Sequence, residues 1–148
     1  MIISKVKNRI KQLTQPKFTC PLCKYRGVFK DVNPSTGYRK YCRCPNCTSA
    51  ERNRLQKLVL EEVFEKFNLS KKKALHFAPE TFFRSYFSNK FQEYVSSDLE
   101  REDVMVKADM TAVPFADDEF DFIFASHVLE HIKDDIQALK EIKKGSET

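Results

Sequence analysis

Glycine is scarce in this sequence: Gly27, Gly37 and Gly145 are the only three in 148 residues. This scarcity excludes a Walker-type phosphate loop and the ordinary Gly-x-Gly-x-x-Gly dinucleotide turn, since both need closely spaced glycines. Long apolar runs are also missing. No stretch of 18 apolar residues occurs, so the sequence predicts no membrane span and no membrane partner. The first residues lack the apolar segment of a secretory signal, and we therefore expect a cytoplasmic protein.

Acidic residues are nearly absent from the first third of the chain. Residues 1–57 hold 14 Lys and Arg against 2 Asp and Glu, a formal charge of +12. Residues 58–148 hold 12 against 19, a charge of −7, and the two parts account for the net charge of +5. A boundary between two functional halves is therefore expected near the end of the first third.

All five cysteines fall within residues 18–48. Four of them form two Cys-x-x-Cys pairs with 20 residues between the pairs. Two thiolates on each of two tight turns can complete a tetrahedral Zn²⁺ site, and a reducing compartment favours metal binding over disulfides. Four cysteine ligands leave no open position, so we expect a structural zinc ribbon, with Cys42 as a packing residue. The predicted ligands are Cys20, Cys23, Cys44 and Cys47.

Hydrophobic periodicity divides the chain into four segments. Residues 1–17 predict a basic amphipathic helix, residues 18–48 the zinc ribbon, and residues 49–70 a connecting helix. Thr48 and Glu51 match a capping box at the start of that helix. Residues 71–148 form the fourth segment. The connecting helix is expected to bury one apolar face made of Leu55, Leu58, Val59, Val63 and Phe67.

Short apolar runs alternate with helical patterns after residue 71, which indicates a parallel α/β sheet. Ligands of such sheets bind beyond the carboxyl ends of the strands. Asp98 follows the second predicted strand, where a carboxylate can accept both hydroxyls of a ribose. Asp109 follows the third, where an acid and a backbone N–H can hold an adenine edge. The residues at the strand ends therefore predict an adenosine-type pocket.

Two motifs in this half carry a family resemblance. Residues 113–121 read Val-Pro-Phe-Ala-Asp-Asp-Glu-Phe-Asp, and residues 127–132 read His-Val-Leu-Glu-His-Ile. With them, residues 74–142 resemble the class I S-adenosylmethionine-dependent methyltransferases, especially the type 11 group. The chain is most similar to a bacterial subgroup with an N-terminal four-cysteine zinc ribbon. The subgroup's signatures here are Cys-Thr-Ser-Ala-Glu-Arg at 47–52 and His-Phe-Ala-Pro-Glu at 76–80, which replaces the glycine-rich loop.

The resemblance implies a Rossmann-like methyltransferase sheet, S-adenosyl-L-methionine as cofactor and an unknown methyl acceptor. It assigns Phe77–Glu80 to the methionine part of the cofactor and Asp98 to the ribose. Asp109 and Met110 take the adenine position, and His127 faces the methyl-transfer site. The family accelerates transfer chiefly by positioning the acceptor, so no catalytic base is assigned. The implied cofactor-binding residues are Phe77, Ala78, Pro79, Glu80, Asp98, Asp109, Met110 and His127.

Family members continue from the last helix into three further strands, whereas residues 143–148 occupy the turn before them. We therefore expect an incomplete, C-terminally truncated sheet of strands 1–4 only, in the order 3-2-1-4. Its fourth strand would be an unprotected edge suited to self-association. Much of the acceptor pocket would be missing, which would limit the activity of these 148 residues. The expected edge residues are Phe122, Ile123, Phe124 and Val128.

Two other interpretations compete with a methyltransferase. The first is a non-catalytic zinc-ribbon binding module for RNA or another acidic partner on a degenerate methyltransferase scaffold, which the basic ribbon supports. The presence of Asp98 and Asp109 argues against it, because a scaffold does not need them. The second is an inverzincin protease, since residues 127–131 read His-x-x-Glu-His. That chemistry needs a third metal ligand well downstream, and the sequence provides none.

Overall fold

The computed structural model describes residues 15–35 and 37–145. It divides between Glu65 and Lys66 into two compact units, which are described separately. The basic helix expected over residues 1–17 falls almost entirely outside the described residues. Among the described residues, no helix combines the length and the apolar character that a membrane crossing requires.

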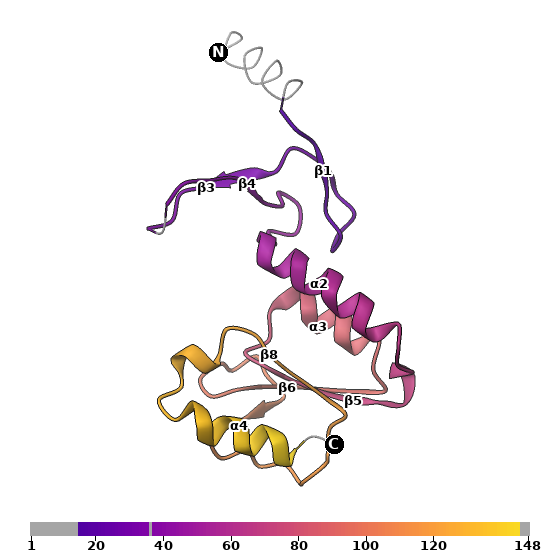
Figure 1. The fold of residues 1–148 in the computed structure, drawn as a ribbon, viewed down its shortest axis with the longest axis vertical. Coiled ribbons are helices and arrows are strands. Elements are labelled where there is room, and N and C mark those ends of the chain that lie inside the picture. The colour runs from indigo at the N-terminus through magenta and orange to yellow at the C-terminus, as the bar shows by residue number, and fades with distance from the viewer. Residues whose placement is uncertain (1–14, 36, 146–148) are drawn as a thin grey trace. The chain divides into compact units, whose positions relative to one another are not determined.

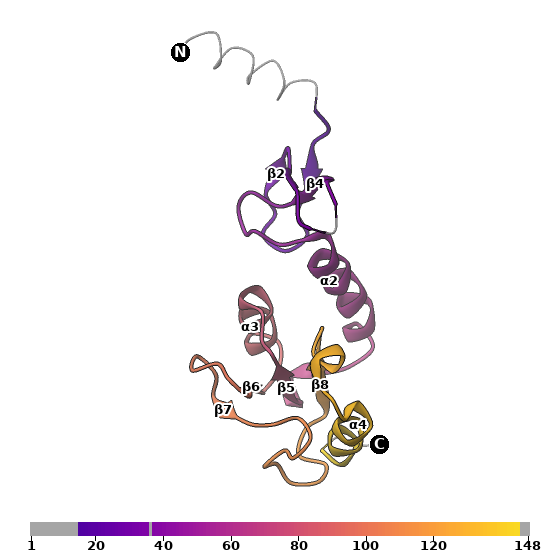
Figure 2. The same ribbon diagram turned by 90° about the vertical axis from the view of Figure 1, so that its left-hand side faces the viewer.

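In its described residues, unit 1 contains two short antiparallel hairpins and one helix, α2 (Figures 1 and 2). Its small core consists of Cys20, Phe29 and Cys44 with the half-buried side chains around them, and α2 contributes none of these residues. Arg54 ties α2 to the hairpins, because its guanidinium donates to the carbonyls of Ser49 (2.7 Å) and Cys42 (2.9 Å). The elements are β1 (Phe18–Thr19), β2 (Arg26–Gly27), β3 (Lys30–Val32), β4 (Arg39–Arg43) and α2 (Glu51–Phe64).

Helix α2 differs from its sequence prediction at its start and on its surface. Ala50 is the N-cap, and its N–H donates to the Asn53 side chain at 3.0 Å. Thr48 is not the cap, because it lies two residues earlier in a left-handed turn with φ of 60°. The expected apolar face is exposed rather than buried, because the helix buries a different face, made of Asn53, Lys57, Leu60 and Phe64. Its helical residues Leu55, Leu58, Val59 and Val63 are 41–63 % exposed, and Phe67 lies beyond the end of α2.

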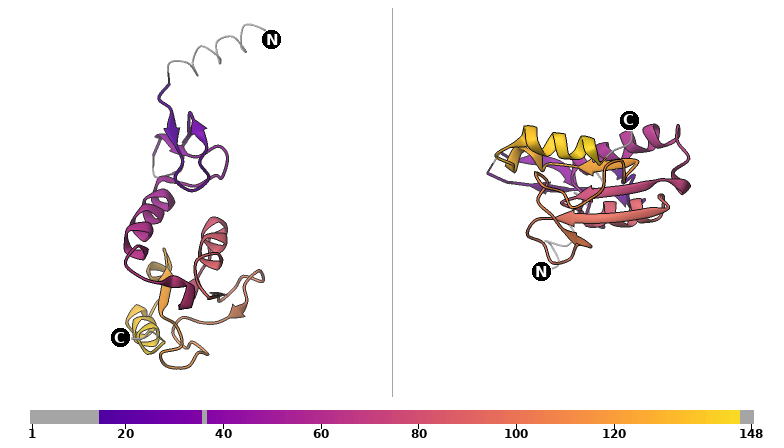
Figure 3. Two further views of the ribbon diagram at one scale, coloured as in Figure 1. Left: turned by 90° about the vertical axis from the view of Figure 1, so that its right-hand side faces the viewer. Right: turned by 90° about the horizontal axis from the view of Figure 1, so that it is seen from below.

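Unit 2 is a parallel four-stranded sheet in the order β7-β6-β5-β8, which confirms the predicted order 3-2-1-4 (Figures 2 and 3). Helices α3 and α4 cover opposite faces of the sheet (Figure 2). Short 3₁₀ turns cover Leu69–Lys71 and Leu129–His131. The strands and helices are β5 (Lys73–Phe77), α3 (Thr81–Ser88), β6 (Glu93–Asp98), β7 (Val106–Lys107), β8 (Phe122–Ala125) and α4 (Asp135–Lys144).

The core of unit 2 follows from the alternation of side chains along the central strand β5. Leu75 and Phe77 belong to a buried cluster that includes Ala138 of α4. His76 belongs to the other face and is fully buried among aromatic rings. Its ring lies 5.1 Å from Phe87 of α3, and its Nδ1 lies 3.0 Å from the Tyr94 hydroxyl.

The connection from β6 to β7 contains no helix among the described residues. Residues 99–105 form a crossover of only seven residues, although parallel neighbours usually need a dozen or more. The short path suffices because β7 pairs only with the carboxyl end of β6, at Ser97 and Asp98. Arg101 fixes the crossover by donating to both carboxylate oxygens of Asp103 at 2.8 and 2.7 Å.

Burial of His76 predicts a pH-dependent stability of unit 2. Burial lowers the pKa of His76 in the folded state below its ordinary value of 6.5. The unfolded chain therefore takes up a proton as the pH falls through about 6.5, whereas the folded chain takes one up only at a lower pH. Stability that is present above this pH is lost below it. The free energy of unfolding, measured by urea titration of the NMR signals of Leu75 and Ile123, should fall between about pH 7.5 and 5.5.

His76→Phe removes the titrating group and keeps an aromatic side chain, so it should flatten this pH dependence even if it changes the stability itself. An equal slope in both proteins would show that His76 is not the group responsible.

Candidate functional site

The two cysteine pairs of unit 1 lie on turns with the same backbone geometry. The Lys24 N–H donates to the Cys20 carbonyl at 2.9 Å, and the Thr48 N–H donates to the Cys44 carbonyl at 3.0 Å. Lys24 and Thr48 have nearly the same left-handed φ, 61° and 60°. Each turn therefore presents its two thiols in the same way, as expected of two halves of one site.

The four predicted zinc ligands lie together, with their Sγ atoms all within 4.8 Å of one another. Cys20 and Cys47 are 3.7 Å apart, and Cys23 and Cys44 are 3.6 Å apart, measured between their Sγ atoms. A tetrahedron with Zn–S bonds of about 2.3 Å has edges of about 3.8 Å, so the spacing fits Zn²⁺. Cys42 lies outside the cluster and is buried against backbone carbonyls of its own hairpin.

The surroundings of the thiols bear on their ionisation. Burial raises the pKa of Cys44 to about 12. Desolvation also opposes ionisation of Cys23, but hydrogen bonds from the Asn46 side chain and the Tyr25 backbone lower its pKa to about 6. The buried Ser49 hydroxyl lies 3.1 Å from the Cys47 Sγ and can donate to a thiolate there. A divalent cation would be needed to hold all four residues as thiolates at neutral pH.

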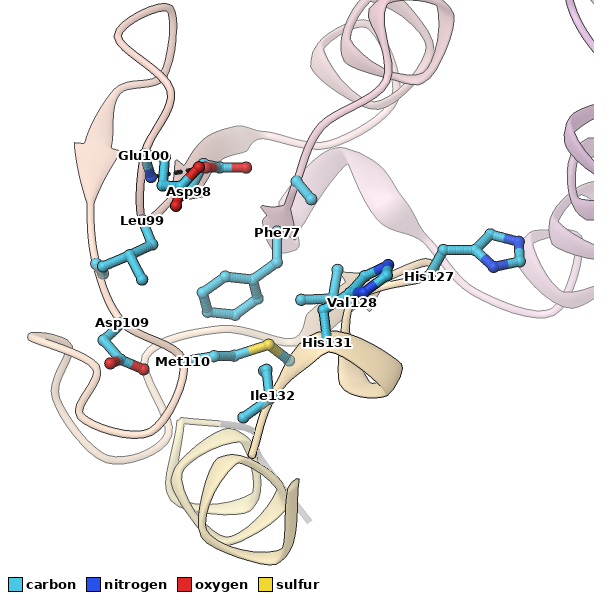
Figure 4. Close-up of a pocket in the computed structure, with 12 residues that line it drawn as sticks. Phe77, Asp98, Leu99, Glu100, Asp109, Met110, His127, Val128, His131 and Ile132 are labelled. Carbon is cyan, nitrogen blue, oxygen red and sulfur yellow. Dashed lines mark hydrogen bonds between the residues drawn. The ribbon is translucent and has the colours of Figure 1, made fainter. Parts of the chain in front are cut away.

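In unit 2, a pocket of about 370 Å³ lies at the carboxyl edge of the sheet (Figure 4). This volume is in the range of small-molecule sites, roughly 300–1,000 Å³. Six predicted site residues line the pocket, namely Phe77, Ala78, Asp98, Asp109, Met110 and His127. The other six, to which the sequence assigned no cofactor contact, are Leu99, Glu100, Ala108, Val128, His131 and Ile132. Leu99, Ala108 and Val128 are immediate neighbours of a predicted residue, and His131 is part of the His-x-x-Glu-His motif, whereas Glu100 and Ile132 are neither.

Pro79 and Glu80 are not among the residues that line the pocket, and they contact the structure behind it. The carbonyl of the buried Pro79 accepts from Arg101 Nη1 at 2.9 Å and from Arg84 Nε at 3.4 Å. The Glu80 Oε2 lies 3.5 Å from the Nε2 of the buried His76. These two residues therefore anchor the loop after β5.

The two predicted nucleotide-binding acids are fixed by local hydrogen bonds. Asp98 Oδ1 accepts the backbone N–H groups of Glu100 (2.9 Å) and Arg101 (3.1 Å). Asp109 Oδ1 accepts the backbone N–H of Thr111 at 2.8 Å and its hydroxyl at 2.7 Å. These hydrogen bonds hold the pKa of Asp109 below its usual value. In each carboxylate Oδ1 serves the turn, while Oδ2 has no hydrogen bond to another described residue.

Left-handed backbone occurs at two strand ends that border the pocket. Ala78 has φ of 46° after β5, and His127 has φ of 57° after β8. Such conformations cost a residue with a Cβ roughly 1–2 kcal/mol and concentrate at functional sites. The Ala78 N–H donates to the Ser97 carbonyl at 2.9 Å, which holds this turn. The loop thus turns sharply without a glycine.

The His-x-x-Glu-His motif forms an internal hydrogen bond rather than a metal site. His127 Nδ1 lies 3.0 Å from Glu130 Oε1, and this hydrogen bond lowers the pKa of Glu130. The His127 ring points away from Phe77 at the centre of the pocket (Figure 4). Within residues 15–35 and 37–145, the four cysteines are the one group of side chains with metal-binding geometry. This geometry gives the protease interpretation no support.

The parallel sheet, its flanking helices and the pocket at its carboxyl edge define a Rossmann-like fold. Residues 68–145 match the family described as "Methyltransferase domain", and this match covers more than half of the chain. The chain therefore belongs to this methyltransferase family.

A solved structure, "Crystal structure of a SAM dependent methyltransferase from Aquifex aeolicus", shares the fold with a TM-score of 0.50 and 18 % sequence identity. The match covers 67 % of this chain and 69 % of that one. Among curated proteins, no sequence matches significantly.

The cysteine geometry predicts how metal binding responds to substitution. Cys20→Ser or Cys47→Ser removes one of four thiolates and should release the zinc and unfold the ribbon, because the metal supplies folding free energy. Cys42→Ser is the matched control, since Cys42 is buried but lies outside the cluster. Zinc content per chain, measured after gel filtration, should drop only in the first two variants. Full zinc retention in Cys20→Ser would contradict this assignment.

Proposed function

We propose that this chain binds S-adenosylmethionine in the pocket of unit 2 and serves transfer of its methyl group to an acceptor. The observation that carries the proposal is the meeting of Ala78, Asp98 and Asp109 in one pocket of a methyltransferase-family domain. The related solved structure supports it, since that protein is described as SAM-dependent.

The chemistry of the lining suits this cofactor. Asp98, Glu100 and Asp109 supply carboxylates, which favour a ligand with cationic groups and hydroxyls. Phe77 and Met110, both buried, supply apolar surface to the lining (Figure 4). S-adenosylmethionine matches both kinds of surface, because it combines an aromatic base with ribose hydroxyls and a positive charge.

Each residue has a role in this proposal. Asp98 Oδ2, which makes no hydrogen bond within its own turn, accepts hydrogen bonds from the ribose hydroxyls. Asp109 and Met110 hold the adenine, and Phe77 and Ala78 border the methionine part. The bound cofactor supplies a methyl group on a positively charged sulfur, which an acceptor lone pair can attack. The residues of this chain contribute by positioning and by excluding water, and no catalytic base is assigned.

We also propose that the four clustered cysteines hold one structural Zn²⁺. The S–S distances support it, as does the absence of a disulfide among the five cysteines, all of which lie in described residues. Free cysteines are typical of a reducing compartment, which supports a cytoplasmic location.

Asp98→Asn tests the cofactor proposal without removing the turn. The amide oxygen can still accept the N–H groups of Glu100 and Arg101, but the negative charge is lost. Binding of S-adenosylhomocysteine to the zinc-loaded chain, measured by calorimetry, should weaken by about 1.5–3 kcal/mol, as for the loss of hydrogen bonds to a charged group. Asp117→Asn is the matched control, because Asp117 is an exposed turn acid outside the pocket.

Equal affinity in Asp98→Asn and the unsubstituted chain would show that Asp98 only stabilises its turn. No binding by a folded, zinc-loaded chain would overturn the proposed function of these 148 residues.

A further inference from the structure

The surface of the zinc ribbon is more basic than its metal centre requires. Residues 15–50 contain seven Lys and Arg, all exposed, and one acid, Asp31. One Zn²⁺ and four thiolates together carry a charge of about −2. The ribbon therefore keeps a net charge of about +4 after the metal centre is neutralised. The basic residues are Lys17, Lys24, Arg26, Lys30, Arg39, Lys40 and Arg43.

Two of these basic residues face each other across the β3–β4 hairpin. Lys30 and Arg43 are direct cross-strand partners, and both are exposed. Neither side chain has an ion-pair partner among the described residues, whereas Arg39 pairs with Glu51 at 2.5 Å. Like charges directly opposite each other destabilise a hairpin, and an anion placed between them would relieve the repulsion.

One exposed aromatic ring, that of Phe18, packs against two rings close in sequence to this basic pair. Phe18 is 39 % exposed, and its ring centroid lies 5.5 Å from that of Phe29 and 5.9 Å from that of Tyr41. Phe29 directly precedes Lys30, and Tyr41 lies two residues before Arg43. The Phe18 ring is thus held by two neighbours while part of its surface faces solvent. A fixed, exposed ring beside cationic side chains is what an unpaired nucleobase stacks on.

We propose that this ribbon surface binds single-stranded nucleic acid, with Lys30 and Arg43 on phosphates and Phe18 stacked on a base. The proposal rests on the zinc centre that folds the ribbon and is independent of the cofactor pocket. Phosphate groups explain the unpaired like charges, and unstacked bases explain the exposed ring. Because both sugars carry the same phosphates and bases, RNA and DNA single strands share this chemistry.

The test is fluorescence anisotropy of short labelled oligonucleotides of mixed sequence with the full zinc-loaded chain at several salt concentrations. Lys30→Gln with Arg43→Gln should weaken binding at low salt at least tenfold. It should also reduce the slope of log K against log salt by about 1.4, because each lost single-strand phosphate contact removes about 0.7. Lys133→Gln with Lys140→Gln is the matched control: it removes the same charge from exposed positions of unit 2, and binding should stay within about twofold.

Two single variants separate binding from folding. Lys30→Glu creates an ion pair opposite Arg43, so it should stabilise the hairpin and retain zinc while binding falls strongly. Phe18→Leu keeps an apolar side chain but removes the ring, so affinity should fall several-fold with the salt slope unchanged.

Single-stranded RNA and single-stranded DNA of the same sequence are compared to show which of the two the ribbon binds. The matching duplex should bind more weakly than either single strand. Equal losses in the two double variants, or duplex binding as tight as single-strand binding, would overturn the proposal. S-adenosylhomocysteine titration and zinc content of the same samples report separately on the proposed function. Intact cofactor binding without oligonucleotide binding would therefore reject the ribbon proposal alone.

Discussion

The parallel pairing of β5 with a strand on each side is the constraint on which the pocket depends. Phe77 is in register with Ser97 of β6 and with Ala125 of β8, so the three strands end at nearly the same level. The residues that follow them therefore meet at one edge although they are far apart in sequence. Four consecutive buried residues, 74–77, hold β5 in place and thereby fix this edge.

The candidate sites also depend on sharp turns that contain no glycine. In both units, a residue with a side chain adopts the left-handed conformation that such a turn needs. Ala78 and His127 border the pocket in left-handed conformations, and Lys24 and Thr48 adopt similar ones in the cysteine turns. In three of these turns, hydrogen bonds to neighbouring carbonyls offset the cost. The carbonyl of the next residue, Pro79, accepts hydrogen bonds from the Arg84 and Arg101 side chains. The strained loop is therefore held on both sides of the Ala78–Pro79 bond.

Sequence spacing predicted the parts of the structure that depend on short-range or repeated patterns. The two Cys-x-x-Cys pairs predicted the sulfur cluster, and the strand ends predicted Asp98 and Asp109 in one pocket. The role of Thr48 and the path from β6 to β7 depend instead on three-dimensional contacts that a sequence pattern does not predict. The hydroxyl of Thr48 matched a capping box, but Thr48 instead closes the turn of the second cysteine pair, where its N–H donates to the Cys44 carbonyl. The crossover over residues 99–105 needs no helix because of where β7 pairs, which the sequence does not specify.

The division of charge along the chain suits two ligands of opposite sign. Residues 58–148 carry a formal charge of −7, and three carboxylates line the pocket within them. Such a pocket attracts a cationic cofactor and repels phosphates, so a polyanion gains nothing from binding there. The ribbon has the opposite properties, because its one acid is engaged by the Tyr41 N–H at 2.8 Å and by the Tyr38 hydroxyl. The charges of the two units therefore favour the two proposals made above, a cationic cofactor in the pocket of unit 2 and a polyanion on the ribbon of unit 1.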